Sequence, residues 1–207
     1  MVSSRARRTR TCSTSTWSCA RRRTVPSVFS HAVVGAALGT LFRRPGPPAR
    51  FWLAGAACAM VPDLDVVVGL WFGVPWGHML GHRGLTHSLT FAVALGAVVT
   101  ALAFRAPQWR GRRLTVWLFL ALATASHGVL DAMNNAALGV AFFAPFDATR
   151  YFLPWRPIPV SPFAFRFFSA RGWMVFQAEL LMIWLPTAGI AMLASLARWR
   201  QDRPSSR

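Results

Sequence analysis

Long apolar runs alternate with short polar connections along this chain. Five such runs cover residues 30–42, 51–73, 88–104, 114–143 and 173–197. They are apolar on every side, so helical periodicity gives no signal within them. Helix is still the expected form, because lipid offers no other hydrogen-bond partner for backbone N–H and C=O groups. The pattern predicts an all-α, polytopic membrane bundle of about five helices.

Composition and charge agree with a membrane protein. The chain is 54% hydrophobic, yet its net charge is +17 and all 23 of its basic residues are arginine. A basic excess can indicate nucleic acid, an anionic membrane surface or membrane topology, and the hydropathy favours topology. The three cysteines form no CxxC pair, so neither a disulfide framework nor a thiolate zinc site is expected.

The sequence divides into three parts. Residues 1–24 hold seven arginines and few apolar residues, which predicts a disordered or untranslated tail, with Val25 as an alternative start. Aromatic residues are nearly absent from this tail, so we expect no nucleic-acid partner. Residues 25–200 are the predicted membrane-embedded domain, and residues 201–207 a cytoplasmic tail.

The connections between the apolar runs differ in arginine content. If all five runs cross the membrane, residues 43–50, 105–113 and the C-terminus lie on one side with eleven arginines. The opposite side then receives five from residues after position 25, so the positive-inside rule places the N-terminus outside. If residues 1–24 are included, their seven arginines add to the outer side and the bias disappears. Either that tail is absent, or the short first run re-enters without crossing.

Several ionisable residues fall at similar depths in this topology. Counted from the nearest cytoplasmic arginine at the helical rise, one group lies roughly 18–21 Å above the cytoplasmic boundary and a second roughly 27–29 Å above it. The first group is His31, Asp63 and His127, and the second is His87, Asp131 and Glu179. Both depths belong to the outer leaflet of a core about 30 Å thick. We therefore expect a His/Asp metal site near the outer face.

The local sequence supports such a site. Pro62 should break the second helix and let Asp63 and Asp65 face the same side, whereas on a regular helix they would be nearly opposite. The alternative is that these aspartates cap the following helix. An i,i+4 spacing allows His127 and Asp131 to share a helical face, and the same spacing relates His78 to His82.

The loop before the third run has its own signals. Gly81 and Gly84 indicate a close backbone approach around Arg83, and Thr86 or Ser88 can cap the next helix. Arg83 is expected to hold an anionic substrate group or a lipid headgroup.

The later segment 141–172 is rich in proline, aromatic residues and arginine. It indicates an interfacial belt or a lid over the site. Asn134 and Asn135 are candidate contacts to metal ligands or substrate.

Four motifs carry a family resemblance: SHAVVG, PDLD, HRGLTHS and HGVLD. Together they resemble the predicted inner-membrane metal-dependent hydrolases typified by the LexA-regulated YdjM protein, over residues 25–200. The resemblance implies a multi-pass protein of the bacterial inner membrane with hydrolase activity. More remotely, the pair His127 and Asp131 is similar to one in the zinc phospholipase C and P1-nuclease group, which cleaves phosphoesters with clustered metals.

These observations predict a metal-dependent hydrolase of a phosphoester in a lipid or lipid-like substrate. The expected metal is zinc, with manganese or iron as alternatives. Asp65 or Asp131 is the expected general base, and Arg83 is expected to neutralise phosphate charge. The predicted metal ligands are His31, Asp63, Asp65, His82, His87, His127 and Asp131. Membrane lipids and an amphiphilic or phosphorylated small molecule are the expected partners.

Two other functions remain open. A metal or proton transporter also uses intramembrane acids and histidines, but it should place some of them in the cytoplasmic half. A non-catalytic protein that binds metal for stability or sensing would show no turnover.

Overall fold

The computed structural model describes the chain except residues 1–27, 43–48, 160, 162–167 and 202–207. The described residues form helices and loops, with two isolated bridges and no strand. The helices are α1 (Val28–Leu38), α2 (Ala49–Met60), α3 (Leu64–Phe72), α4 (Leu89–Ala103), α5 (Arg113–Ala132), α6 (Ala170–Glu179) and α7 (Leu185–Gln201). Short turns of 3₁₀-helix are η2 (Gly39–Leu41), η3 (Val61–Asp63), η4 (Leu85–His87) and η5 (Pro107–Arg112), and η7 (Leu180–Trp184) is a π-helix. The predicted all-α bundle is confirmed.

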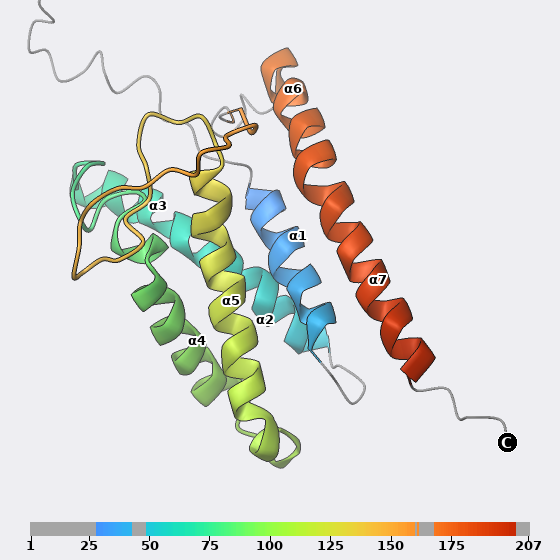
Figure 1. Cartoon of the computed structure of the whole chain (residues 1–207). Coiled ribbons are helices and arrows are strands. Elements are labelled where there is room, and N and C mark those ends of the chain that lie inside the picture. Colours follow the sequence, from blue (N-terminus) through green and yellow to red (C-terminus); the bar gives the residue numbers. More distant parts are fainter. Residues whose placement is uncertain (1–27, 43–48, 160, 162–167, 202–207) are drawn as a thin grey trace, which may run out of the picture.

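These elements join into five apolar segments, as the hydropathy pattern predicts. Three are long and apolar enough to cross a membrane: Ala49–Phe72, Pro107–Ala132 and Ala170–Gln201. Two are shorter, Val28–Leu41 and Leu89–Ala103. In Figure 1, α5 lies among α1, α2 and α4, and the long α6–α7 helix lies beside α1 at the edge of the bundle.

The expected helical limits are wrong at one place. The fourth apolar run was expected to continue to about residue 143, but α5 ends at Ala132. Asn134 explains the end, because its side-chain oxygen accepts a hydrogen bond from the Ala136 N–H at 2.9 Å. Such local bonds give the backbone an alternative to the helix.

An aromatic core fills the end of the bundle that the arginine counts predict to be cytoplasmic. The rings of Phe51 and Phe119 stack with centroids 4.3 Å apart, and Phe104 and Trp109 pack around them. The guanidinium of Arg50 lies 5.4 Å from the Trp109 ring centroid. This core holds α2, α4 and α5 together at the end away from the histidines.

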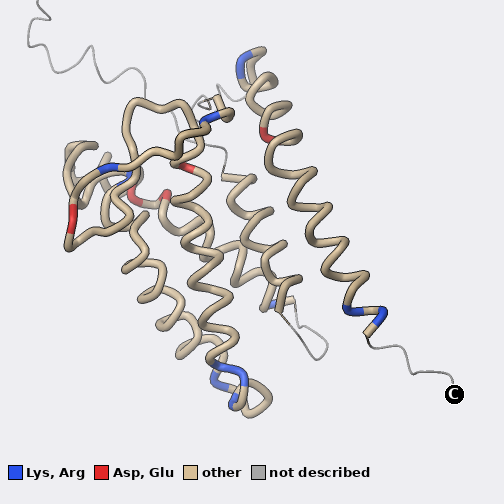
Figure 2. The backbone as a smooth tube through the Cα atoms, in the orientation of Figure 1, with Lys and Arg blue, Asp and Glu red and all other residues tan. Residues whose placement is uncertain are grey.

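The described aspartates lie at one end of the bundle, whereas arginines lie at both ends. Figure 2 shows arginines at the lower ends of α4, α5 and α7, and others near the aspartates at the upper end. A lower end with arginines and no described acidic residue agrees with the topology predicted from the arginine counts.

Candidate metal centre

The polar cluster forms where four separate segments of the chain meet. α1 contributes His31, the broken α2–α3 helix contributes Asp63 and Asp65, and α5 contributes His127 and Asp131. The loop between α3 and α4 adds three more residues, His82, Arg83 and His87. All are buried except Asp63, whose side chain is 10% exposed. The convergence expected from the common depth is therefore present.

Pro62 positions the two aspartates. It lies within η3, where the α-helix gives way to a 3₁₀ turn, because proline has no N–H to donate to the helix. Asp63 precedes α3, yet its side chain makes no capping hydrogen bond. The capping alternative therefore does not explain Asp63. Its Oδ1 lies instead 3.4 Å from His127 Nε2.

Hydrogen bonds fix the orientation of the imidazoles. Nδ1 of His127 lies 2.7 Å from the Ala59 carbonyl oxygen, so this nitrogen donates to that oxygen and Nε2 faces His87. Nδ1 of His82 lies 2.8 Å from Asp65 Oδ1, which fixes His82 in the same way. Bonds of this kind orient metal-ligating histidines.

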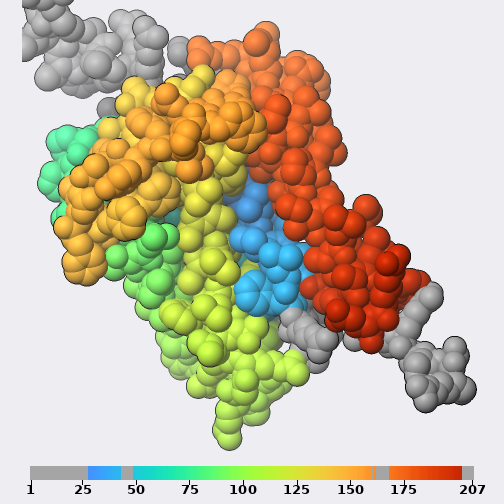
Figure 3. Space-filling model, in the orientation of Figure 1, coloured from blue at the N-terminus to red at the C-terminus, as the bar shows by residue number. Residues whose placement is uncertain are grey.

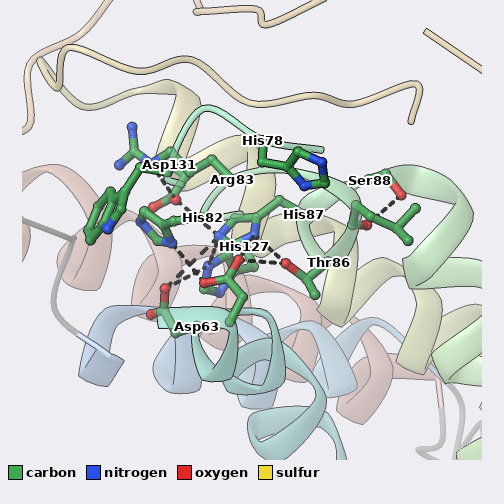
Figure 4. A network of polar contacts seen from close by, with 12 residues as sticks. Asp63, His78, His82, Arg83, Thr86, His87, Ser88, His127 and Asp131 are labelled. Carbon is green, nitrogen blue, oxygen red and sulfur yellow. Dashed lines mark hydrogen bonds and ion pairs between the residues drawn. The ribbon is translucent and has the colours of Figure 1, made fainter. Parts of the chain in front are cut away.

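The nitrogen and oxygen atoms that remain point toward one another (Figure 4). His87 Nε2 lies 3.0 Å from His127 Nε2 and 3.3 Å from Asp131 Oδ2, and His31 Nε2 lies 3.7 Å from Asp131 Oδ1. Two ligands of one tetrahedral zinc, each about 2.0–2.1 Å from the metal, are themselves about 3.3 Å apart. The observed separations are close to this value.

Three overlapping groups of ligand atoms can each hold a metal ion, with their atoms within 4.8 Å of one another. Asp63, His87 and His127 each belong to two of them. The groups are His31–Asp63–His127, Asp63–His82–His87 and His87–His127–Asp131. Sharing of this kind is compatible with one ion or more. Six of the seven predicted ligands are included.

Asp65 is the predicted ligand outside these groups. Thr86 Oγ1 donates to its Oδ2 at 2.6 Å, and its carboxylate also faces the Nδ1 atoms of His82 and His87 at 2.8 and 3.2 Å. Asp65 therefore orients two imidazoles, and its direct coordination of metal stays a prediction. No sequence pattern indicated this role of the Thr86 hydroxyl, whereas Ser88 caps α4 by accepting from the Phe91 N–H, as expected.

Arg83 occupies the cluster itself and not the membrane surface. Its side chain is 1% exposed, its Nε lies 2.9 Å from Asp131 Oδ2, and its Nη1 donates to the Leu138 carbonyl. This burial places the guanidinium beside the cluster carboxylates rather than at the surface of the bundle. The cluster thus contains three carboxylates and one guanidinium, so neutral imidazoles leave an excess of negative charge that a divalent cation would balance.

The pKa of His87 reflects the negative charge of the neighbouring carboxylates. Burial lowers its pKa, but hydrogen bonds and charge from Asp131 and Asp65 raise it more, to about 9. A cation at Nε2 would take the place of the proton.

Some predicted neighbours lie elsewhere. His78 and His82 do not share a helical face, because the chain from Gly73 to Ser88 runs in turns, and His78 is exposed. Gly81 and Gly84 do make the expected close approaches, to the carbonyl oxygens of Pro75 and Met79.

The segment after α5 holds the loop in place. Both guanidinium nitrogens Nη1 and Nη2 of Arg150 donate to backbone carbonyls of this loop, among them those of Arg83 and His78, both at 3.0 Å. Asn134 pairs with Ile158, the Asn135 N–H donates to the Ile158 carbonyl, and the Asn134 N–H donates to the backbone carbonyl of Asp131 at 3.4 Å. Residues 160 and 162–167 of the predicted belt or lid segment lie outside the described residues.

Comparison with known proteins now places the chain. The model of the YdjM inner membrane protein family matches residues 27–202, which include every residue of the cluster. The chain belongs to the YdjM family. It is 36% identical to the inner membrane protein YbcI of Escherichia coli (strain K12) over 179 residues, which cover 86% of this chain and 99% of YbcI. This YdjM-family chain is a multi-pass protein of the bacterial inner membrane.

No solved structure matches this chain. The comparisons also give no support for the remote likeness to zinc phospholipase C and P1 nuclease.

Proposed function

We propose that this YdjM-family protein is a membrane-bound, metal-dependent hydrolase that cleaves a phosphoester in a lipid or lipid-like substrate. One observation carries the proposal: four separate segments bring histidine and aspartate atoms into three overlapping groups of metal-binding size. Zinc is favoured by the mixture of imidazole and carboxylate ligands. A bound metal would activate a water molecule and polarise the phosphoester oxygen.

The surrounding side chains supply the other requirements of hydrolysis. The water oxygen forms a bond to phosphorus, the bond to the leaving alcohol oxygen breaks, and one proton passes from the water to the departing oxygen. Asp131 is the better placed carboxylate to carry that proton, because neither of its oxygens has a hydrogen-bond partner in the described part of the chain, whereas Asp65 accepts from Thr86. Arg83, beside Asp131, is placed to balance the phosphate charge.

A non-catalytic metal-binding role or metal transport is the alternative. Among the described residues, every aspartate and glutamate lies in the upper part of the bundle, and the lower ends carry arginines (Figure 2). Four of the five histidines belong to the metal-binding groups with these aspartates. An ion crossing the membrane would need polar groups in both halves. This distribution favours an enzyme over a transporter.

A turnover screen in nanodiscs tests the proposal. Metal-loaded protein should release phosphate or alcohol from at least one phosphoester of a monoester and diester lipid panel. Asp131→Asn should reduce the rate by at least about 100-fold, the usual size of a lost acid–base group. Asp147→Asn is the matched control, since the Asp147 carboxylate lies outside the cluster and accepts only from Thr149 and Tyr151 in the described structure. Metal-loaded protein without turnover on the whole panel would favour the non-catalytic role.

A further inference from the structure

An apolar groove of about 410 Å³ lies beside the break between α2 and α3. Its walls include Val28 of α1 and Ala57, Met60, Leu64 and Val67 of the broken helix. Three of these side chains, Met60, Leu64 and Val67, are 37%, 58% and 45% exposed, so the groove opens on the outside of the bundle. Its volume is in the range of small-molecule sites.

The inner end of the groove reaches the metal centre. Asp63 is the one charged residue in its lining, and it belongs to two of the three metal-binding groups. Both carboxylate oxygens are buried without a hydrogen-bond partner in the described part of the chain. Asp63 is also the most exposed side chain of the cluster, at 10% against 0–3% for the others. The groove is therefore an approach to the metal ligands from outside the bundle.

The water-facing side of the centre is covered by two loops. The Ala141 N–H donates to the Arg83 carbonyl at 3.0 Å, and the Leu89 N–H donates to the Phe142 carbonyl at 2.9 Å. Arg150 adds bonds to the carbonyls of His82 and Arg83. In Figure 3 the segment that follows α5 covers this end of the molecule. Direct approach from water is thus obstructed, whereas the groove is open.

We infer that the substrate is a membrane lipid that enters sideways from the bilayer, with one hydrocarbon chain in this groove and its phosphate at the metal held by Asp63. Apart from Val28, the residues that line the groove belong to Ala49–Phe72, a candidate membrane span, so lipid chains surround its mouth. An apolar chain gains from burial there, while a polar soluble substrate loses its hydration. The inference rests on the proposed function and names the source of the substrate.

Photocrosslinking tests the route without requiring turnover. The metal-loaded protein is placed in nanodiscs that contain phosphatidic acid with a diazirine in one acyl chain, and labelled peptides are identified by mass spectrometry. Label should concentrate on residues 57–67 in the wild type. Ala57→Trp and Val67→Trp fill the groove and should reduce this label about tenfold, equivalent to about 1.4 kcal/mol of binding. Val93→Trp, at a 49% exposed position of α4, should leave it unchanged.

Metal content of the same samples separates the two proposals. Loss of label with full metal content supports the groove. Label spread evenly over the apolar helices, or unchanged in both groove variants, overturns the lipid route while the hydrolase proposal stands. A wild type that takes up no metal overturns both. If a Trp variant loses metal, Val67→Phe replaces it.

Discussion

Arg83 has an unusual backbone conformation for its residue type. Its φ is 61°, in the left-handed region that favours glycine. Its guanidinium is nevertheless buried between Asp131 and the Leu138 carbonyl. A strained backbone persists where the surroundings fix it, and such residues concentrate at functional sites. The contacts of Arg83 therefore give it two linked roles, to hold the loop against α5 and to orient the Asp131 carboxylate.

The pair should behave as one unit in stability measurements. Arg83→Met or Asp131→Asn leaves a buried group without its partner, so each should lower the free energy of unfolding in detergent by about 3–5 kcal/mol. The double variant should cost less than the sum, because neither charge is then left alone. Additive losses in denaturant titrations would show that the two residues do not interact.

The residue types of the cluster could be predicted, but their contacts could not. The common depth of His31, Asp63 and His127 depends only on helical rise and on the arginines at the helix ends, and both are visible in the sequence. The exposure of His78 depends on the turns after Gly73, whose path is set by tertiary contacts such as the Arg150 bonds. The i,i+4 spacing alone therefore predicted a shared helical face for His78 and His82 that the structure does not have.

At the scale of elements, α1 and α2 approach each other through small residues. A Cβ at Gly35 would lie 2.5 Å from Ala59 Cβ and 2.6 Å from the Gly55 carbonyl oxygen. Small residues let backbones approach closely in membrane helices. This crossing lies one turn below His31 and fixes the distance of α1 from the metal centre.

Gly35→Ala should therefore destabilise the protein. The added methyl group must separate α1 from α2, which should cost about 1–3 kcal/mol and lower the melting temperature in detergent. Gly189→Ala is the control, because Gly189 in α7 has open space around its Cβ position and should lose nothing. Equal melting temperatures for Gly35→Ala and the wild type would contradict this packing.

The limits of the helices could be predicted where the sequence carries a helix-breaking residue or a clear change in hydropathy. Pro62 predicted the break in the second helix, and the hydropathy runs predicted five helical segments. The end of α5 was misjudged because the residues after Ala132 remain apolar, while the decisive Asn134 hydrogen bond is a local effect that hydropathy does not measure.

At the scale of the whole molecule, the bundle has a basic end and a metal-binding end. Arg110, Arg112 and Arg113 lie at the α4–α5 connection, which the positive-inside rule places in the cytoplasm. The loop that contains Gly77 lies near the opposite end, beside the cluster.

Cysteine labelling tests this orientation. In a background without Cys12, Cys19 and Cys58, Gly77→Cys should react with a membrane-impermeant maleimide added to intact spheroplasts. Gly111→Cys should react only after the membrane is opened. Both glycines have open space around the Cβ position, so the substitutions should be tolerated. The reverse labelling pattern would invert the topology.

The convergence of histidines and aspartates on one metal is the central claim, and metal stoichiometry tests it most directly. Purified protein is stripped with chelator, reloaded with zinc and measured by mass spectrometry. The wild type and His78→Ala should retain at least one zinc ion per chain, since His78 is exposed and lies outside the metal-binding groups. His127→Ala and Asp63→Asn should lose most of it. Full zinc retention in both of these variants, or none in the wild type, would contradict the account.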